Sequence, residues 1–255
     1  ILIEGLHRLE YRGYDSAGLS ILDSDNVLQT RKTIGKVADL EAVCKGNFVS
    51  GNTGISHTRW ATHGAPSSTN SHPHVSSGIS IVHNGIIENH DALREEMIAA
   101  GYEIQSDTDS EVIAHLIHQQ LETCTDLREA VNKTIARLRG AYALGVMSDE
   151  YPGLIIGARS GSPLVVGVGM DEHFIASDQM ALRQVTDRFV YLEEGDVVEL
   201  SSEAYTVFGA NGKAVKRELH QLSETDQIAD KGQYRHFMQK EMFEQATVLA
   251  DTFAG

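Results

Sequence analysis

Apolar residues recur three and four positions apart in several parts of the first 140 residues, and this spacing predicts helices. Leu2, Leu6 and Leu9 begin the pattern, with polar residues between them. Glycines close two of the segments, at Gly13 and Gly101. The helices expected are residues 1–11, 36–44, 89–100, a segment opened by a capping box at 108–111 and ending near Glu122, and 126–137.

Other segments alternate apolar with polar residues or form short apolar runs, and both patterns predict strands. From Ala141 onward this period of two dominates, and residues 209–212 predict a hairpin turn. Strands followed by helices and then by many antiparallel strands predict an α+β fold in which helices cover the sheets. The strands expected are residues 17–22, 28–35, 54–60, 79–83, 141–147, 154–159, 164–168, 174–177, 189–192, 197–200, 205–208 and 214–219.

Composition narrows the class of protein. The chain has 255 residues, 41% of them hydrophobic, and a net charge of −15, which argues against binding to nucleic acid or to an anionic membrane. No apolar run approaches the roughly 20 residues that span a bilayer. The two cysteines, Cys44 and Cys124, form no disulfide framework or CxxC motif, and we expect a reducing, cytoplasmic location. Because Ile1 stands directly in a helical pattern without a cap, we expect the natural start to lie upstream.

Six of the twelve histidines lie within residues 55–90. His72 and His74 could bind a metal ion, since imidazole is a ligand of zinc and iron. The segment offers only Glu88 as an acidic ligand and contains no HExxH motif, so we expect no metal. Two interpretations remain open: the histidines are satisfied one by one by backbone and water, or they belong to a site of neutral donors for a carbonyl substrate.

Five further residues carry candidate chemistry. Asn84 and Gly85 follow an apolar strand and can supply an oxyanion hole, although Asn-Gly also suits a tight turn. Arg59 can hold a carboxylate, and Asp109, predicted in the first turn of a helix, can hold an ammonium group or complement the helix dipole. Arg12 lies between tyrosines that would order its guanidinium. Together these groups describe a receptor for a free amino acid with a reactive side-chain carbonyl.

Eight blocks, spread in order over essentially the whole chain, resemble the glutaminase domain of the glutamine–fructose-6-phosphate aminotransferases, also called glucosamine-6-phosphate synthases. Other class II glutamine amidotransferases share only the outline of these blocks. The blocks are LEYRGYDSAGL (9–19), HTRWATHG (57–64), NSHPHV (70–75), VHNGIIENH (82–90), SDTDSEVIAHL (106–116), ARSGSPLVVG (158–167), FIASD (174–178) and YRHFMQKEMFEQ (234–245).

The resemblance implies a four-layer αββα N-terminal-nucleophile fold, with two stacked antiparallel sheets between helix layers. It implies that Asn84 and Gly85 form the oxyanion hole, and that Arg12 lies near the reacting end. Arg59 and Asp109 would hold the carboxylate and ammonium groups of L-glutamine. The other substrate-binding residues that it implies are Trp60, which begins a mobile loop, and Thr62, His63 and His72.

In this family an N-terminal cysteine is the nucleophile, and no residue of this chain matches it. We expect residues 1–225 to be a glutaminase domain without its first strand, inactive as it stands, and 226–255 to lead toward a sugar-phosphate isomerase half. The resemblance implies no cofactor, and a homo-oligomeric full-length enzyme that passes ammonia to fructose 6-phosphate to make glucosamine 6-phosphate. A histidine-based metal hydrolase and a non-catalytic glutamine-binding module are the alternatives.

Overall fold

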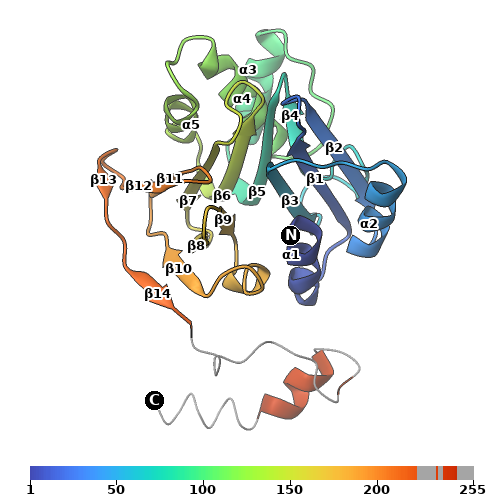
Figure 1. The fold of residues 1–255 in the computed structure, drawn as a ribbon. Coiled ribbons are helices and arrows are strands. Elements are labelled where there is room, and N and C mark those ends of the chain that lie inside the picture. The colour runs from blue at the N-terminus through green and yellow to red at the C-terminus, as the bar shows by residue number, and fades with distance from the viewer. Residues whose placement is uncertain (223–233, 235–237, 246–255) are drawn as a thin grey trace. The chain divides into compact units, whose positions relative to one another are not determined.

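The computed structural model describes residues 1–222, 234 and 238–245. Residues Ile1–Gln221 form one compact unit, and Leu222–Gly255 form a second, in which residues 238–245 are helical. The predicted boundary near residue 225 and most of the predicted linker lie outside the described part of the chain. The larger unit carries all the candidate residues, and its elements are labelled in Figure 1.

Three antiparallel sheets make up the β layers of the larger unit. The first has the strand order β2-β1-β3, the second β14-β10-β8-β9, and the third β13-β12-β11-β7-β6-β5-β4. The strands are β1 Ser16–Leu22, β2 Leu28–Ile34, β3 Thr53–Arg59, β4 His74–Ser76, β5 Ile79–Ile87, β6 Gly140–Ser148, β7 Ile155–Ser160, β8 Val165–Val168, β9 His173–Ala176, β10 Arg188–Tyr191, β11 Val197–Leu200, β12 Tyr205–Phe208, β13 Ala214–Val215 and β14 Leu219–Gln221.

Helices cover the outer faces of the sheets (Figure 1). One core cluster joins three helices to strands β5, β6 and β7 of the seven-stranded sheet, where Leu116, Ile81 and Leu144 are fully buried. Another joins two helices to β1 through Leu6, Leu40 and Leu19. The helices on the first face are α3 His90–Ala99, α4 Glu111–Leu121 and α5 Leu127–Ile135; those on the second are α1 Leu2–Leu9 and α2 Val37–Gly46; two short 3₁₀ helices are η1 Glu10–Arg12 and η2 Gln179–Ala181.

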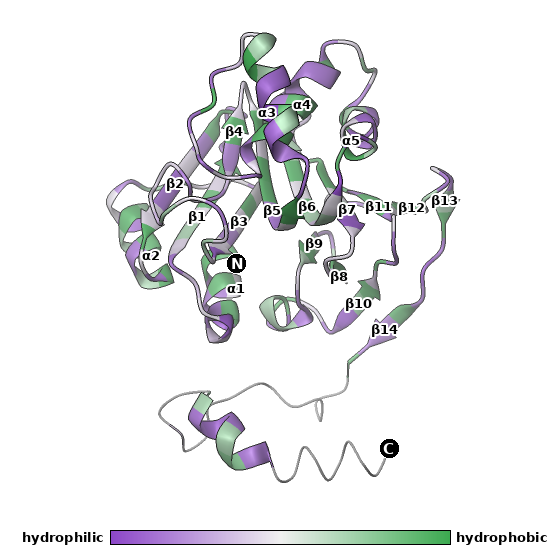
Figure 2. Cartoon of the chain, turned by 180° about the vertical axis from the view of Figure 1, so that it is seen from behind, coloured by the Kyte–Doolittle hydropathy of each residue, from purple (hydrophilic) through white to green (hydrophobic). Residues whose placement is uncertain are grey.

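The seven-stranded sheet packs on the two smaller sheets through its other face. Val198 and Val166 meet in the cluster shared with the four-stranded sheet, and Ile55 and Met147 meet in the cluster shared with the three-stranded one. Figure 2 shows the hydrophobic residues along β5 and β6, the middle of this packing. The predicted α+β fold with four layers, helices–sheet–sheets–helices, is therefore confirmed; the second β layer consists of two separate sheets.

Several expectations about single elements need correction. Strand β5 runs on to Ile87, so Asn84 and Gly85 lie within a strand, paired with Ala143 and Tyr142, and form neither its end nor a tight turn. Strand β4 was not predicted. The single strand expected over residues 214–219 is instead the separate β13 and β14, which join different sheets. The extension of β5 and the position of β14 arise from pairing with the distant strands β6 and β10, which a local pattern does not contain. Strand β4, in contrast, pairs with its neighbour β5 across the short turn at residues 77–78.

Four histidines are buried where β3, β4 and β5 come together: His57, His72, His74 and His83. Burial is the largest cause of the lowered pKa of each. It lowers the pKa of His57 to about 4 and that of His74 to about 3, and it brings the pKa of His72 well below its ordinary value. These rings are therefore neutral at physiological pH.

We predict that the free energy of unfolding decreases as the pH falls from 6.5, the ordinary pKa of histidine, toward the lowered values. In that window the unfolded chain binds protons on these histidines and the folded chain does not, so acid favours unfolding. Urea unfolding at a series of pH values measures the slope. A His74→Gln variant, which removes one such group, should show a shallower slope; an unchanged slope would contradict the assignment.

Candidate active site

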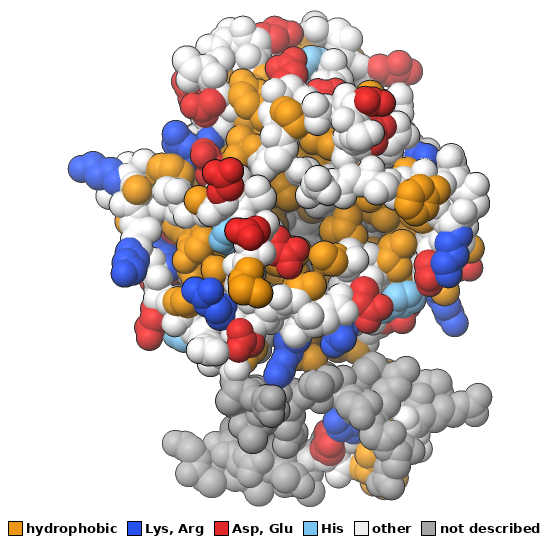
Figure 3. All heavy atoms as spheres, viewed as in Figure 1, with side chains coloured by type: hydrophobic (Ala, Val, Ile, Leu, Met, Phe, Trp, Pro, Cys, Tyr) orange, Lys and Arg blue, Asp and Glu red, His pale blue; other side chains and the backbone are white. Residues whose placement is uncertain are grey.

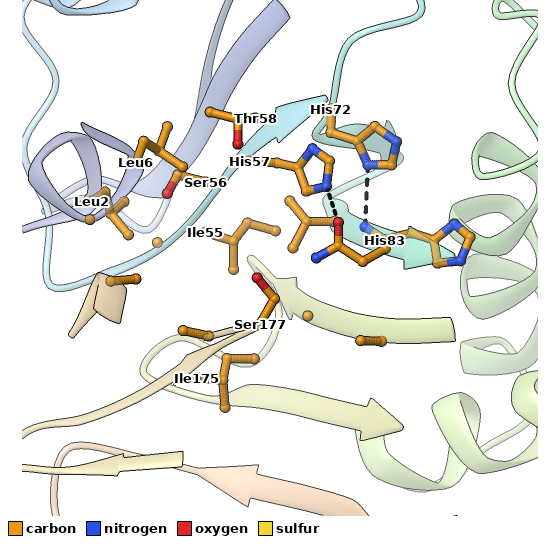
Figure 4. Close-up of a pocket in the computed structure, with 18 of the residues that line it drawn as sticks. Leu2, Leu6, Ile55, Ser56, His57, Thr58, His72, His83, Ile175 and Ser177 are labelled. Carbon is orange, nitrogen blue, oxygen red and sulfur yellow. Dashed lines mark hydrogen bonds between the residues drawn. The ribbon is translucent and has the colours of Figure 1, made fainter. Parts of the chain in front are cut away.

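A cavity of about 830 Å³ opens between β3, β5 and β9. Figure 4 shows β3 residues on one side of it, Ile175 and Ser177 on another, and the histidines at its inner end. All the site residues predicted from the sequence line this one cavity, although they come from five separate stretches of the chain: Arg12, Arg59, Trp60, Thr62, His63, His72, Asn84, Gly85 and Asp109.

Arg59 is the last residue of β3, on which Ile55, His57 and Arg59 alternate as the buried positions. Its side chain is buried at 5% exposure. One terminal nitrogen, Nη2, donates to the carbonyl oxygens of His63 and of Gly64, the latter at 3.1 Å. The other, Nη1, lies 3.8 Å from an Asp15 carboxylate oxygen and has no hydrogen-bond acceptor among the described residues. A buried donor without a partner is costly, so Nη1 is suited to an anionic ligand.

Asp109 connects the beginning of α4 to β5. Its Oδ2 accepts the Ile87 backbone N–H at 2.8 Å, and its Oδ1 accepts the Ser110 hydroxyl at 3.2 Å. The N-cap of α4 is Ser110, which makes no side-chain cap, so the predicted capping box and the placement of Asp109 in the first turn were wrong. Asp109 precedes the helix, and its carboxylate, only 4% exposed, is held at the cavity wall.

Asn84 and Gly85 lie side by side on β5 at the cavity. Asn84 Oδ1 lies 2.9 Å from His57 Nε2, which leaves the amide nitrogen as the other, donor end of the side chain. Gly85 has a φ of +137°, and a Cβ at this position would lie 2.0 Å from the carbonyl oxygen of Ala141. Only glycine fits here, because both the backbone conformation and the close approach exclude a side chain.

The loop after β3 forms the rim of the cavity. Trp60 is 66% exposed, and its ring lies over Gly13, where a Cβ would come within 2.5 Å of the ring carbon Cζ3. Thr62 is exposed, and the ring of His63 meets that of His90 edge-on with centroids 5.2 Å apart. The two bonds from Arg59 to loop carbonyls, together with the bond from the Ala61 N–H to Asp15 Oδ2 and that from Asn70 Nδ2 to the Ala65 carbonyl, hold this loop against the core.

Arg12 crosslinks the cavity walls. Its guanidinium donates to Ser177 Oγ at 3.0 Å and to Asp178 Oδ2 at 2.6 Å, and its Nε donates to the Tyr11 hydroxyl at 3.2 Å. These bonds connect the 3₁₀ helix η1 to the end of β9. The predicted ordering of Arg12 by its tyrosine neighbours thus extends to partners more than 160 positions away.

Sequence reasoning missed some residues that hold the site. His57 contacts Asn84, the backbone N–H of His83 donates to His72 Nδ1 at 3.2 Å, and the His83 ring lies 2.8 Å from Ser110 Oγ. The alternation of Ile55, His57 and Arg59 on one face of β3 was a usable signal for His57. The bonds of His83 had no such signal, because they depend on how α4 meets β5.

The metal interpretation receives no support from the described part of the chain, which contains no group of three or more His, Cys, Asp and Glu residues placed to hold a metal ion. His72 instead stacks against His57 with centroids 4.4 Å apart and meets His74 edge-on at 4.7 Å. Neither thiol lines the cavity: Cys44 is buried in α2, and Cys124 follows α4.

Two observations describe the exterior. In Figure 3, acidic and basic side chains are interspersed over the visible face of the larger unit. No helix within the described ranges is long and apolar enough to cross a membrane.

Comparison with known proteins agrees with this geometry. The chain is 54% identical to the glutamine–fructose-6-phosphate aminotransferase (isomerizing) of Pseudomonas putida, 53% to that of Vibrio vulnificus and 50% to that of Haemophilus influenzae. Each match covers 100% of this chain but only 42% of the relative, so the chain spans less than half of the length of these proteins.

The solved structure of glutamine phosphoribosylpyrophosphate amidotransferase from B. subtilis matches with a TM-score of 0.71 and 25% identity, over 83% of this chain and 46% of that one. This likeness confirms the N-terminal-nucleophile fold expected from the sequence. A family model described as a glutamine amidotransferase domain matches residues 57–184, about half of the chain. The chain therefore belongs to the glutamine amidotransferase family.

Proposed function

We propose that this chain is the glutaminase domain of a glutamine–fructose-6-phosphate aminotransferase, which hydrolyses L-glutamine to glutamate and ammonia. One observation carries the proposal: Arg59, Asp109 and the Asn84–Gly85 pair line the same cavity. These groups supply one buried cation, one buried anion and neutral donors. A zwitterionic amino acid with a side-chain amide has matching requirements.

Recognition of the amino-acid end uses the two charged residues. Arg59 Nη1, which lacks an acceptor in the described residues, donates to the α-carboxylate of glutamine. The Asp109 carboxylate receives the α-ammonium group while Ile87 keeps it in place. Trp60, Thr62 and His63 on the rim, together with His72 at the inner end, enclose the same part of the substrate.

The amide end of glutamine meets Asn84 and Gly85. A thiolate attacks the side-chain carbonyl carbon, and the negative charge that develops on the carbonyl oxygen is stabilised by the Asn84 amide and the Gly85 N–H. The C–N bond then breaks, ammonia leaves with a proton returned by the thiol's base, and a thioester remains. Water hydrolyses the thioester to glutamate and regenerates the thiol. Arg12 orders the neighbouring wall through Ser177 and Asp178.

The attacking thiol belongs to a segment outside these 255 residues, since neither Cys44 nor Cys124 lines the cavity. Among the described strands, β3 and β9 are edge strands of their sheets. Every residue of β3 and of β9 lines the cavity. Because successive side chains of a strand point to opposite faces of its sheet, this lining shows that the open edges of the two strands face the cavity. An extended segment of about seven residues, the length of β3, would pair there and bring its thiol to the Asn84 end.

In the whole protein the ammonia reacts with fructose 6-phosphate in a second, sugar-phosphate half and gives glucosamine 6-phosphate. The similarity to glutamine–fructose-6-phosphate aminotransferases (isomerizing) supports this assignment, and this chain covers 42% of the length of those proteins. A homo-oligomeric enzyme in the cytoplasm, where free thiols such as Cys44 and Cys124 persist, completes the proposal.

Glutamate release tests the proposal directly. The 255-residue chain should bind glutamine without hydrolysing it, and the same chain preceded by a strand that begins with cysteine should hydrolyse it. The matched control begins that strand with serine in place of cysteine and should release at least about 10³-fold less glutamate. Hydrolysis by the chain alone would place the nucleophile within these residues and contradict the thiol assignment.

Arg59→Ala in the active chain should raise the KM for glutamine by roughly 10- to 100-fold, because a charge-assisted hydrogen bond to the carboxylate is lost. Arg188→Ala, on an exposed arginine that does not line the cavity, is the control. Steady-state kinetics with glutamine measures both. If Arg59→Ala keeps the KM of the parent, Arg59 does not bind the carboxylate.

Asn84→Ala should lower kcat by about 10²- to 10³-fold with little change in KM, since the amide stabilises charge that develops only in the transition state. Single-turnover formation of the thioester should slow by the same factor. A variant that raises KM and keeps kcat would show that Asn84 binds the ground state and is not part of an oxyanion hole.

A further inference from the structure

We infer that His57 is a positioning residue that holds the amide of Asn84 with its nitrogen toward the cavity. The inference rests on the proposed glutaminase function and assigns to that reaction a residue that does not itself contact the reacting atoms. It depends on the direction of one hydrogen bond between two β layers.

The bond joins His57 Nε2 to Asn84 Oδ1 at 2.9 Å. His57 belongs to β3 in the three-stranded sheet, and Asn84 belongs to β5 in the seven-stranded sheet. The two strands are not paired by backbone bonds, so this side-chain bond is a direct polar link between them at the cavity (Figure 4). The orientation of the Asn84 amide therefore depends on a residue from the other sheet.

The protonation of the His57 ring and the acceptor oxygen of Asn84 together determine which atom donates in this bond. His57 is 9% exposed, and burial lowers its pKa to about 4, so the ring carries a single N–H at neutral pH. Asn84 Oδ1 can only accept, so the N–H is on Nε2. His57 Nδ1 is then the unprotonated nitrogen, and it is buried without a hydrogen-bond partner among the described residues.

The opposite orientation of the amide is unfavourable. A flipped Asn84 would place its NH₂ group against the Nε2–H of His57, so two donors would face each other and the bond would be lost. The same flip would turn Oδ1 toward the cavity, where it would repel an oxyanion. The tautomer of His57 thus decides whether the end of Asn84 that faces the substrate is a donor or an acceptor.

The ring of His57 is itself held in place. It stacks on the His72 ring with centroids 4.4 Å apart and planes inclined by 25°. His72 Nδ1 accepts the backbone N–H of His83, the residue directly before Asn84 on β5. The contacts therefore begin and end on β5: His83 bonds to His72, His72 stacks on His57, and His57 bonds to Asn84. Both ring planes are set by the strand that carries the oxyanion donors.

Proton transfer by His57 is not part of the inference. Its unprotonated nitrogen, Nδ1, is buried, and its Nε2–H is used by Asn84. The ring acts on the reaction only through the amide that it orients.

Two substitutions of His57 distinguish a role in orienting Asn84 from a role in packing alone. Both variants are made in the full-length enzyme and assayed with glutamine as substrate. In the His57→Gln variant the new side-chain amide nitrogen can occupy the place of the imidazole Nε2. In the His57→Asn variant the shorter side chain places its amide nitrogen where Nδ1 was. His57→Asn should lower kcat by about 10²-fold with a KM change below about threefold. His57→Gln should recover at least about tenfold of that loss. His220→Asn, on an exposed histidine in β14, is the matched control.

A second comparison uses the Asn84→Ala background. There His57→Asn should lower kcat by less than about threefold further, because the group that His57 orients is already gone. Independent losses that multiply would overturn the inference. Equal kcat values for His57→Asn and His57→Gln would also overturn the inference, as would a His57→Asn variant that raises KM and leaves kcat unchanged.

Histidine ¹⁵N NMR of the unsubstituted enzyme tests the inference without relying on the folding of any variant. The spectrum should show His57 protonated at Nε2 and unprotonated at Nδ1 at neutral pH, and the opposite tautomer would overturn the inference. Failure of the proposed function is distinguishable, because the unsubstituted enzyme would then release no glutamate from glutamine. An active enzyme whose His57→Asn variant keeps full kcat overturns the positioning role alone.

Discussion

Polar groups buried between the two β layers need partners from the protein, and this constraint shapes the cavity. Asp109 is held by the Ile87 N–H, Arg59 Nη2 by two loop carbonyls, and Asn84 by His57. These bonds fix each group at the cavity wall, and for Arg59 they leave Nη1 without an acceptor among the described residues. Because leaving such groups unpaired costs about 1–3 kcal/mol each, the fold keeps them in these orientations before any ligand binds. The site is therefore preorganised by the same bonds that make its burial tolerable.

The cavity has two different parts, and the packing of the sheets explains both. Near β5 its lining includes Asn84 and Asp109, whereas Ile55 and Ile175 line it from β3 and β9. The second part lies between two sheet edges that the described residues leave unpaired, and in the proposed enzyme an extended segment would cover both. In the proposed enzyme, glutamine would thus bind in the region near β5, and an added strand would occupy the adjacent region between β3 and β9.

The α+β class and most of the elements could be predicted from the sequence, because hydrophobic period carries that information, and the family resemblance supplied nine residues that line the cavity. The sequence did not indicate that Asn84 lies inside a strand, since this depends on the pairing of β5 with β6. It also misplaced Asp109, whose partner is the Ile87 backbone and not its own helix. Motif resemblance identified which residues come together, whereas the bonds that orient them depend on contacts between sheets.

The predominance of neutral donors in residues 55–90 follows from the charge that the site must handle. In the proposed complex, glutamine brings one positive and one negative group, and Asp109 and Arg59, which both line the cavity, would match them one to one. A third fixed charge beside the reacting amide would be buried without a partner in the ground state, where the carbonyl is still neutral. Amide and N–H donors are favourable both before and after the oxyanion forms. The buried histidines beside the cavity meet the same requirement, because their lowered pKa values keep them uncharged.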